Sequence, residues 1–206
     1  MRSNYDSQLG ELHRLLLLMG AACSRAIATS VKALEENDTK AVERLSALDD
    51  EIDGLYRQIQ SLCQRLILRE QPVASDLRQI SAALKMITDL ERIGDQAEDI
   101  SEIIPHLDGK TGSECGAIHD MAETAISMVT DSIEAYSAKN AALAAEVIER
   151  DDIVDAGFTQ ARDALISMIS ADNGSAEYAL DLLMIAKYLE RIGDHATNIA
   201  ELVSSL

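Results

Sequence analysis

The sequence is poor in aromatic residues and in residues that interrupt helices. It has no tryptophan, one phenylalanine, five tyrosines and only two prolines among 206 residues. A hydrophobic core must therefore be built from Leu, Ile, Val, Ala and Met, and 47% of the residues are hydrophobic. This composition argues against a fold with many strands and favours long helices.

Basic residues are also scarce. The chain has 18 Lys and Arg against 36 Asp and Glu, for a formal net charge of −18. Such a balance argues against a nucleic-acid-binding protein, which needs clustered basic residues, and against direct adsorption to anionic lipid. It is compatible with cation binding and with docking on a basic protein surface. The excess of acid is also compatible with a role in solubility alone.

The three cysteines, Cys23, Cys63 and Cys115, lie far apart and form no CxxC pair. Neither a disulfide framework nor a thiolate zinc site is expected, and the cysteines are predicted to be buried in a reducing compartment. The apolar run at residues 15–23 is too short to cross a bilayer. Acidic residues precede this run, unlike the basic start of an export signal, so we predict no membrane segment and a cytoplasmic location.

Motifs of catalysis are missing as well. The four histidines show neither the HExxH nor the ExxH spacing of metalloenzymes, and the chain has no GxSxG, P-loop or GxGxxG. We expect His195, which follows Asp194, to support a site or to lie at the surface rather than to bind a metal. The sequence therefore predicts a protein that is not an enzyme.

Apolar residues recur in steps of three and four along most of the chain, which indicates helices that bury one stripe. Asn140 and Asn37-Asp38 are predicted to cap helices, and Ser75 is a further candidate. Pro105 is predicted to end a helix. The other predicted breaks are at Gln71-Pro72 and Asn173-Gly174.

The second half of the sequence repeats the first. The hexapeptide LERIGD occurs at residues 90–95 and again at 189–194, and DDEID at residues 49–53 matches DDIVD at 151–155. Two matched landmarks in the same order indicate a duplicated three-helix unit. We predict an all-α fold of two tandem antiparallel three-helix bundles, at residues 1–107 and 113–206, joined by a linker at 108–112.

Acidic or amide residues recur at spacings of four along four of the predicted helices. Like charges at this spacing repel each other and weaken an isolated helix, so they need a counter-charge. Neighbouring arginines, Arg92 and Arg191, offer one source. A divalent or trivalent cation offers the other, because hard ions prefer oxygen ligands. The candidate ligands are Asp49, Asp53, Glu91, Asp95, Asp99, Asp151, Asp155, Glu190, Asp194 and Asn198.

Two glycines favour the cation. Gly94 and Gly193 stand inside the predicted acidic helices, where glycine costs about 1 kcal/mol relative to alanine. A missing side chain there would let a neighbouring helix approach and bring its aspartate pair toward the glutamate and aspartate of the motif. We therefore favour a metal site over a purely structural role.

The stretches QPVASDLR (71–78), LERIGD (90–95) and LERIGDHATNIAE (189–201), with the DDEID and DDIVD segments, resemble the PhoU family over essentially the whole chain. The resemblance implies metal ions bound at E(D)xxxD motifs: Glu91 with Asp95, and Glu190 with Asp194. The paired aspartates and Asn198 are further contributors. Where the family pattern has asparagine, this chain has Asp99, and Glu98 adds another acid. The first site is thus expected to bind its ion more tightly, or to bind a different one.

The resemblance also implies a function. Members of the family act as negative regulators of phosphate uptake and phosphate-starvation signalling. They are thought to connect the ATPase subunit of a phosphate ABC transporter with a sensor histidine kinase at the inner face of the membrane. A homodimer and bound Mg, Mn, Fe or Zn are expected by the same analogy. The alternative is a helical protein that binds or stores metal, or a metal-dependent enzyme, unrelated to kinase signalling.

Overall fold

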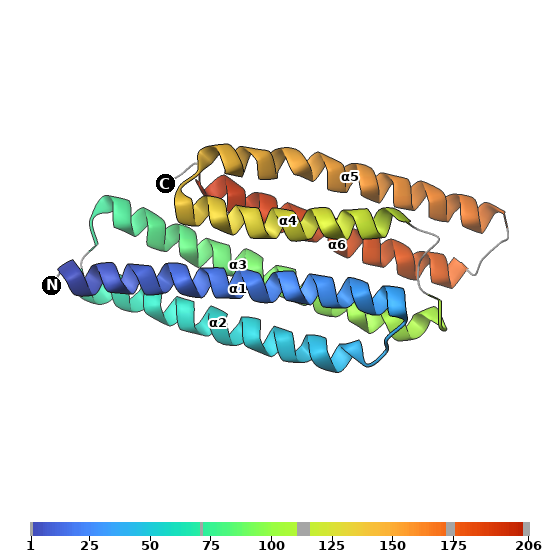
Figure 1. The fold of residues 1–206 in the computed structure, drawn as a ribbon, viewed down its shortest axis with the longest axis horizontal. Helices are drawn as coiled ribbons and strands as arrows, with labels where there is room; N and C mark the ends of the chain where they lie inside the picture. Colours follow the sequence, from blue (N-terminus) through green and yellow to red (C-terminus); the bar gives the residue numbers. More distant parts are fainter. Residues whose placement is uncertain (1, 71, 111–115, 172–175, 204–206) are drawn as a thin grey trace.

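The computed structural model describes residues 2–70, 72–110, 116–171 and 176–203, and these form helices and short connections without a strand. The all-α prediction is therefore confirmed. The helices, drawn in Figure 1, are α1 (Arg2–Glu36), α2 (Ala41–Glu70), α3 (Ala74–Ile103), α4 (Gly116–Ala138), α5 (Ala141–Ser170) and α6 (Ala176–Val203), with a 3₁₀ turn, η1 (Ile104–Leu107), after α3.

The predicted helix ends are mostly confirmed. The Asn140 side chain accepts hydrogen bonds from the backbone N–H groups of Ala142 and Leu143, both at 3.1 Å, and so caps α5. Pro105 lies in η1, directly after the end of α3. The prediction for Ser75 is wrong, because α3 begins at Ala74 and its N-cap, Val73, makes no side-chain cap hydrogen bond.

The other connections are only partly described. The Asp38 side chain accepts a hydrogen bond from the Lys40 N–H at 3.0 Å, which closes the turn before α2. Asp108 and Gly109, in the predicted linker, both have positive φ angles, 51° and 82°, and turn the chain after η1. Asn173-Gly174, Cys115 and the end of the predicted linker lie outside the described residues. Cys23 and Cys63 are buried free thiols, as expected.

Each half of the chain forms a three-helix bundle around an aliphatic core. In the first half α1, α2 and α3 pack against one another, and in the second half α4, α5 and α6 do so. Leu12, Ile52 and Met86 from the first half, and Leu182 and Ile192 from the second, are fully buried. The helical stripes read from the sequence thus face the two bundle interiors.

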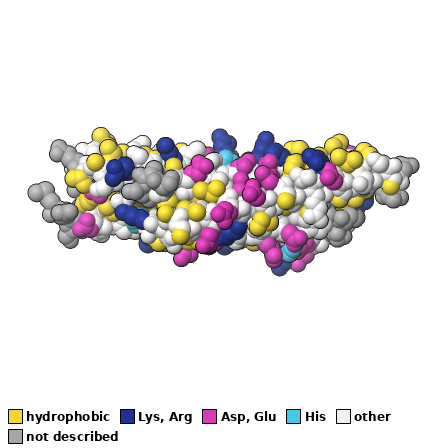
Figure 2. Space-filling view, turned by 90° about the horizontal axis from the view of Figure 1, so that it is seen from above, with side chains coloured by type: hydrophobic (Ala, Val, Ile, Leu, Met, Phe, Trp, Pro, Cys, Tyr) yellow, Lys and Arg dark blue, Asp and Glu magenta, His cyan; other side chains and the backbone are white. Residues whose placement is uncertain are grey.

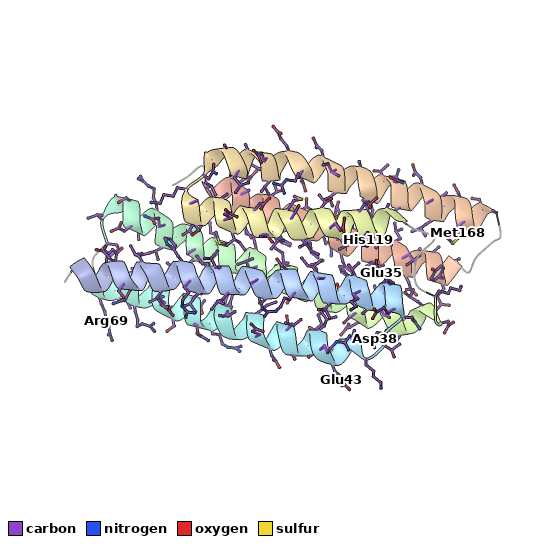
Figure 3. The ribbon with its side chains drawn as sticks, viewed as in Figure 1. Glu35, Asp38, Glu43, Arg69, His119 and Met168 are labelled. Carbon is purple, nitrogen blue, oxygen red and sulfur yellow. The ribbon has the colours of Figure 1, made fainter. Side chains whose placement is uncertain are left out.

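The two bundles lie side by side along their length, so that the molecule is an elongated double bundle (Figure 1). α1 packs on α4, and α3 packs on α6. At the first contact Gly20 of α1 has no side chain to separate it from Ile133 of α4: a Cβ on Gly20 would lie 1.9 Å from the Ile133 Cδ1 atom. His119 of α4 adds a polar contact to Glu35 of α1 at 2.7 Å (Figure 3).

Helix α1 is long and apolar enough to cross a membrane by length and composition, over Tyr5–Glu36. However, 56% of its most apolar window is buried inside the protein. Leu12 and Met19 are fully buried, whereas Leu17 and Leu18 of the same run are 47% and 42% exposed. The apolar residues of α1 thus serve mainly as the core of the double bundle.

Candidate functional site

The two mid-helix glycines let a neighbouring helix approach closely. A Cβ on Gly94 of α3 would lie 2.8 Å from Ile52 Cδ1 and 3.4 Å from Asp49 Oδ1 of α2. A Cβ on Gly193 of α6 would lie 3.1 Å from Asp151 Oδ1 of α5. The glycines therefore hold the aspartate of one helix against the backbone of the next, as the sequence predicts.

Acidic side chains of α2 and α3 gather around Gly94. Burial, the negative charge of Glu98 and that of Asp95 raise the pKa of Asp49 to about 6. Burial and the charges of Asp95 and Asp53 also raise the pKa of Glu91, although Arg92 opposes this. We call this group the first acidic cluster; it consists of Asp49, Asp53, Glu91, Asp95 and Glu98.

The second half has an equivalent group around Gly193. Burial, then Asp194 and Asp155, raise the pKa of Asp151 to about 6. The pKa of Asp194 is raised by burial and by the charges of Glu190 and Asp155, against the effect of Lys187. This second acidic cluster consists of Asp151, Asp155, Glu190 and Asp194.

Basic side chains supply part of the counter-charge. Arg92 pairs with Asp95 at 3.1 Å, and Arg57 pairs with Asp53 at 2.9 Å, in the first cluster. In the second, Lys187 pairs with Glu190 at 2.5 Å. Among the described residues no three His, Cys, Asp or Glu side chains converge closely enough to hold a metal ion. Within the clusters, Asp53, Asp95 and Glu190 thus have a basic partner in the described structure.

The residues nevertheless fit a hard cation. One carboxylate oxygen of Asp151 is buried and has no hydrogen-bond partner, which is unfavourable for an ionised group. Each cluster also holds an aspartate whose pKa is raised to about 6 by burial and by the negative charge of neighbouring carboxylates. Carboxylates from two facing helices are the ligand type that Mg²⁺, Mn²⁺ and similar ions prefer. An ion would satisfy the Asp151 oxygen and reduce the repulsion.

Two predicted ligands point away from the clusters. Asp99 of α3 is hydrogen-bonded to Tyr188 of α6, and Asn198 of α6 donates to Asp89 Oδ1 of α3 at 3.2 Å. Both side chains therefore lie at the contact between the bundles. The reason is helical geometry: eight residues turn a helix by two full turns plus about 80°, which carries position i+8 off the face of position i.

Glu98 belongs to the first acidic cluster, although the spacing of four along α3 does not select it. Its charge has the largest effect of any neighbouring carboxylate on the Asp49 pKa, and its side chain is hydrogen-bonded to Ser46 of α2. One feature of the sequence does indicate that Glu98 faces the cluster. It lies seven residues after Glu91, and seven residues bring a helix back to within about 20° of the same face. The equivalent position in α6 is Thr197, so the second cluster has one acid fewer.

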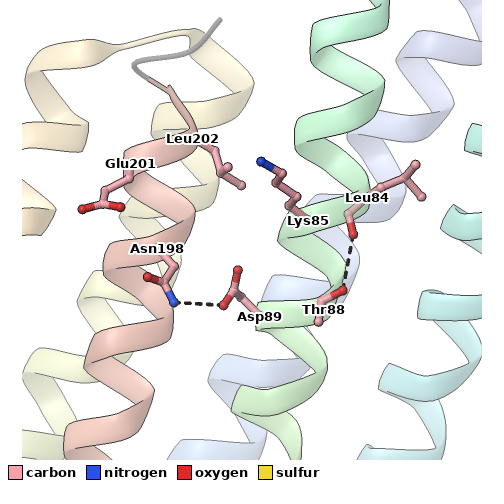
Figure 4. Close-up of a pocket in the computed structure, with 7 residues that line it drawn as sticks. All are labelled: Leu84, Lys85, Thr88, Asp89, Asn198, Glu201 and Leu202. Carbon is pink, nitrogen blue, oxygen red and sulfur yellow. Dashed lines mark hydrogen bonds between the residues drawn. The ribbon is translucent and has the colours of Figure 1, made fainter.

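His195 contacts the other bundle. Its Nδ1 atom lies 2.9 Å from Asp89 Oδ1, the same oxygen that accepts from Asn198. Beside this contact is a pocket of about 610 Å³ between α3 and α6, in which the Asp89–Asn198 hydrogen bond is visible (Figure 4). His195 thus supports the interface between the bundles, a role that the sequence pattern did not indicate.

The sequence and the fold both have counterparts in known proteins. The PhoU domain model matches residues 16–104 and 118–203. A phosphate-specific transport system accessory protein PhoU homolog from Clostridium acetobutylicum is 39% identical over 202 residues, which is 97% of this chain and 92% of that protein.

Two solved structures have the same fold as this chain. The crystal structure of PhoU from Pseudomonas aeruginosa superposes with a TM-score of 0.91 at 32% identity, over 97% of this chain and 96% of that one. The phosphate transport system regulatory protein PhoU from Streptococcus pneumoniae gives a TM-score of 0.87 at 25% identity, over 97% and 94%. With the duplicated acidic helices, these matches show that the chain belongs to the PhoU family.

Proposed function

We propose that this protein is a negative regulator of phosphate uptake and of phosphate-starvation signalling. It would act as an adaptor in the cytoplasm, peripheral to the membrane, between the ATPase subunit of a phosphate ABC transporter and a sensor histidine kinase. In this role it catalyses no reaction. Its contribution is to bind two partners and to couple their states.

The observation that carries the proposal is the match to relatives named as accessory proteins of phosphate-specific transport, over 97% of this chain. The match runs through both halves and includes both acidic helices. The absence of a known catalytic motif in the sequence is compatible with an adaptor. A net charge of −18 suits docking on basic surfaces of partner proteins.

We further propose that each acidic cluster binds cations. Glu91, Asp95 and Asp49 would hold an ion in the first cluster, and Glu190, Asp194 and Asp151 in the second. An ion there would supply positive charge that joins α2 to α3 and α5 to α6. The first cluster has Glu98 where the second has Thr197, whereas two arginines pair with its aspartates against one lysine in the second cluster. The two clusters should therefore differ in the ion that they bind or in their affinity for it.

The test of the regulatory role is alkaline phosphatase activity in cells that lack this gene, grown in abundant phosphate. We expect high activity in the deletion strain and repressed activity when the wild-type gene is restored. The same assay with Glu91→Gln/Glu190→Gln reports whether the clusters matter for signalling.

Activity that stays repressed in the deletion strain would contradict the regulatory proposal. Because the acidic clusters do not depend on that outcome, metal binding or storage would then become the leading function. Co-purification with the transporter ATPase subunit, compared between phosphate-rich and phosphate-starved cells, separates the adaptor role from an indirect effect on transport.

A further inference from the structure

A second pocket between the bundles has a composition unlike the rest of this acidic protein. It has a volume of about 540 Å³ and lies between α3 and α6. Its lining includes Arg92 and Gln96 from α3 and Arg191, His195 and Thr197 from α6. Among the described residues that line it, only Asp194 is acidic. In a chain with twice as many acids as bases, this concentration of positive charge is unexpected.

The two arginines occupy equivalent positions in the two halves and meet at this pocket. Arg92 uses one terminal nitrogen for Asp95, and the guanidinium group carries five N–H donors in all. Arg191 makes no side-chain hydrogen bond or ion pair to any residue that the structure describes. Both groups therefore retain donors for an anion, and the planar guanidinium suits the oxygens of phosphate.

The pocket also contains hydrogen-bond acceptors that have no donor partner. Gln96 is only 9% exposed, and its Oε1 atom is buried without a hydrogen-bond partner. The Thr197 hydroxyl is buried and unpartnered too. A buried amide oxygen without a donor is unfavourable. A ligand that satisfies it must carry an O–H or N–H group as well as the negative charge that the arginines attract.

A phosphate group has this combination. At neutral pH, inorganic phosphate bears oxygens that accept from arginine and at least one P–OH that can donate to Gln96. Sulfate has the same shape and only acceptors, so it would leave the Gln96 oxygen unsatisfied.

The differences between the duplicated motifs also favour an anion at this place. Where α3 has Gln96, Glu98 and Asp99, α6 has His195, Thr197 and Asn198. The α6 copy thus exchanges two acids for neutral groups and adds a histidine. Two acids of α3 at this interface already have partners in α6: Asp89 is contacted by His195 and Asn198, and Asp99 is hydrogen-bonded to Tyr188 and lies near the charge of Arg191.

From this geometry we propose that the pocket between α3 and α6 binds a protonated phosphate group, with Arg92 and Arg191 holding its oxygens and Gln96 accepting from its P–OH. The group is either free inorganic phosphate or the monoester of a small molecule, bound in the monoanionic form that keeps a P–OH. The inference goes beyond the proposed function, because binding by the purified chain requires no partner protein.

Isothermal titration of the full chain with inorganic phosphate tests the proposal, with a chelator present so that phosphate cannot bind through a metal ion. We expect saturable binding at millimolar phosphate or below, and at least tenfold weaker binding of sulfate at equal ionic strength. Glycerol phosphate in a parallel titration separates the two sources: tighter binding of the monoester assigns the pocket to a phosphorylated small molecule.

The variant Arg92→Gln/Arg191→Gln should weaken phosphate binding at least tenfold, whereas Arg162→Gln, an exposed arginine on α5, should leave it unchanged. Gln96→Met should reduce the preference for phosphate over sulfate. Circular dichroism confirms that each variant is folded. No saturable binding to the wild type, or equal binding by the double arginine variant, would overturn the proposal. Equal affinity of the wild type for sulfate would overturn the role of Gln96.

Discussion

Gly94 and Gly193 determine how closely the aspartates of α2 and α5 approach the acidic helices. The space at Gly94 is already filled, since an added Cβ would lie 2.8 Å from the fully buried Ile52 side chain. Gly54, also inside a helix, has no atom within 4 Å of the place a Cβ would take. Gly94 is therefore needed for the close packing of α2 on α3, whereas Gly54 is not. Both glycines lower the helix propensity of their segments.

Gly94→Ala should lower the free energy of unfolding by about 1 kcal/mol, because overpacking costs about 1–3 kcal/mol and exceeds the gain of about 1 kcal/mol in helix propensity. Gly54→Ala should raise it by up to about 1 kcal/mol. Chemical denaturation of both variants measures the difference. A stabilised Gly94→Ala protein would show that the helices are not held at this distance.

Asp49 and Asp151 make stability depend on pH. Both have a pKa of about 6 in the folded protein against an ordinary value of 3.8. The folded state therefore binds protons more tightly than the unfolded chain, and stability falls as the pH rises from about 4 to about 6. Above about pH 6, both carboxyl groups are ionised in the folded and unfolded states, so stability no longer changes with pH through these groups.

The variant Asp49→Asn/Asp151→Asn should consequently stabilise the metal-free protein at pH 7. Allowing for solvent screening of these partly exposed groups, we expect about 1 kcal/mol, or a Tm higher by roughly 2–4 °C. The gain should disappear near pH 4, where the wild-type groups are protonated. Thermal melts in chelator at both pH values provide the comparison. A gain that is equal at both would contradict the electrostatic explanation.

At the scale of the helices, the ends are stabilised in different ways. The Asn140 side chain accepts two backbone N–H groups at the start of α5. The start of α3 has no side-chain cap, and the Ser75 hydroxyl lies 3.5 Å from the neighbouring Asp76 instead. A side-chain cap therefore contributes to the start of α5 and not to the start of α3.

Asn140→Ala should lower the free energy of unfolding by about 1 kcal/mol, the usual effect of losing an N-cap. Ser75→Ala should change it by less than about 0.5 kcal/mol, as is usual for surface substitutions. Urea denaturation midpoints of the two variants test this. Equal losses would mean that Ser75 caps α3 in solution after all.

The sequence predicts where the helices lie and which side of each is buried, but it predicts less well which neighbouring helix a given side chain contacts. A step of three or four defines the buried stripe, and residues of that stripe such as Ile52, Ile59 and Ile80 lie fully buried in the core. The i, i+4, i+8 pattern fails at its last position, because the drift of about 80° turns Asp99 and Asn198 toward the contact between the bundles. Periodicity shows which side of a helix is buried but not which neighbour covers it.

At the scale of the molecule, the duplication gives the interface between the bundles its own approximate symmetry. Asp89 of α3 contacts Asn198 of α6, and Tyr188 of α6 contacts Asp99 of α3. Each pair maps onto the other by the 99-residue offset of the LERIGD repeat. This interface could not be read from the sequence, since it depends on contacts between halves rather than on a pattern within either.

The contact between α1 and α4 also joins the two bundles, and it requires the missing side chain of Gly20. Gly20→Ala should lower the free energy of unfolding by about 1–3 kcal/mol, since its Cβ would clash with the buried Ile133 side chain. Gly10→Ala, in the same helix, meets no atom within 4 Å and should be neutral or stabilising. Hydrogen exchange should show faster opening of α1 and α4 in the first variant only. Matching behaviour of the two variants would argue against close packing of the bundles.

The most direct test of the central claim, that the two acidic clusters bind cations, is the metal content of the purified protein. Elemental analysis of the wild type should find bound metal, and Glu91→Gln/Glu190→Gln should lose most of it while circular dichroism shows nearly unchanged helix content. Glu146→Gln/Glu149→Gln, two exposed acids of α5 outside the clusters, serves as the control and should retain the metal. An unchanged metal-to-protein ratio in the first variant would contradict the account.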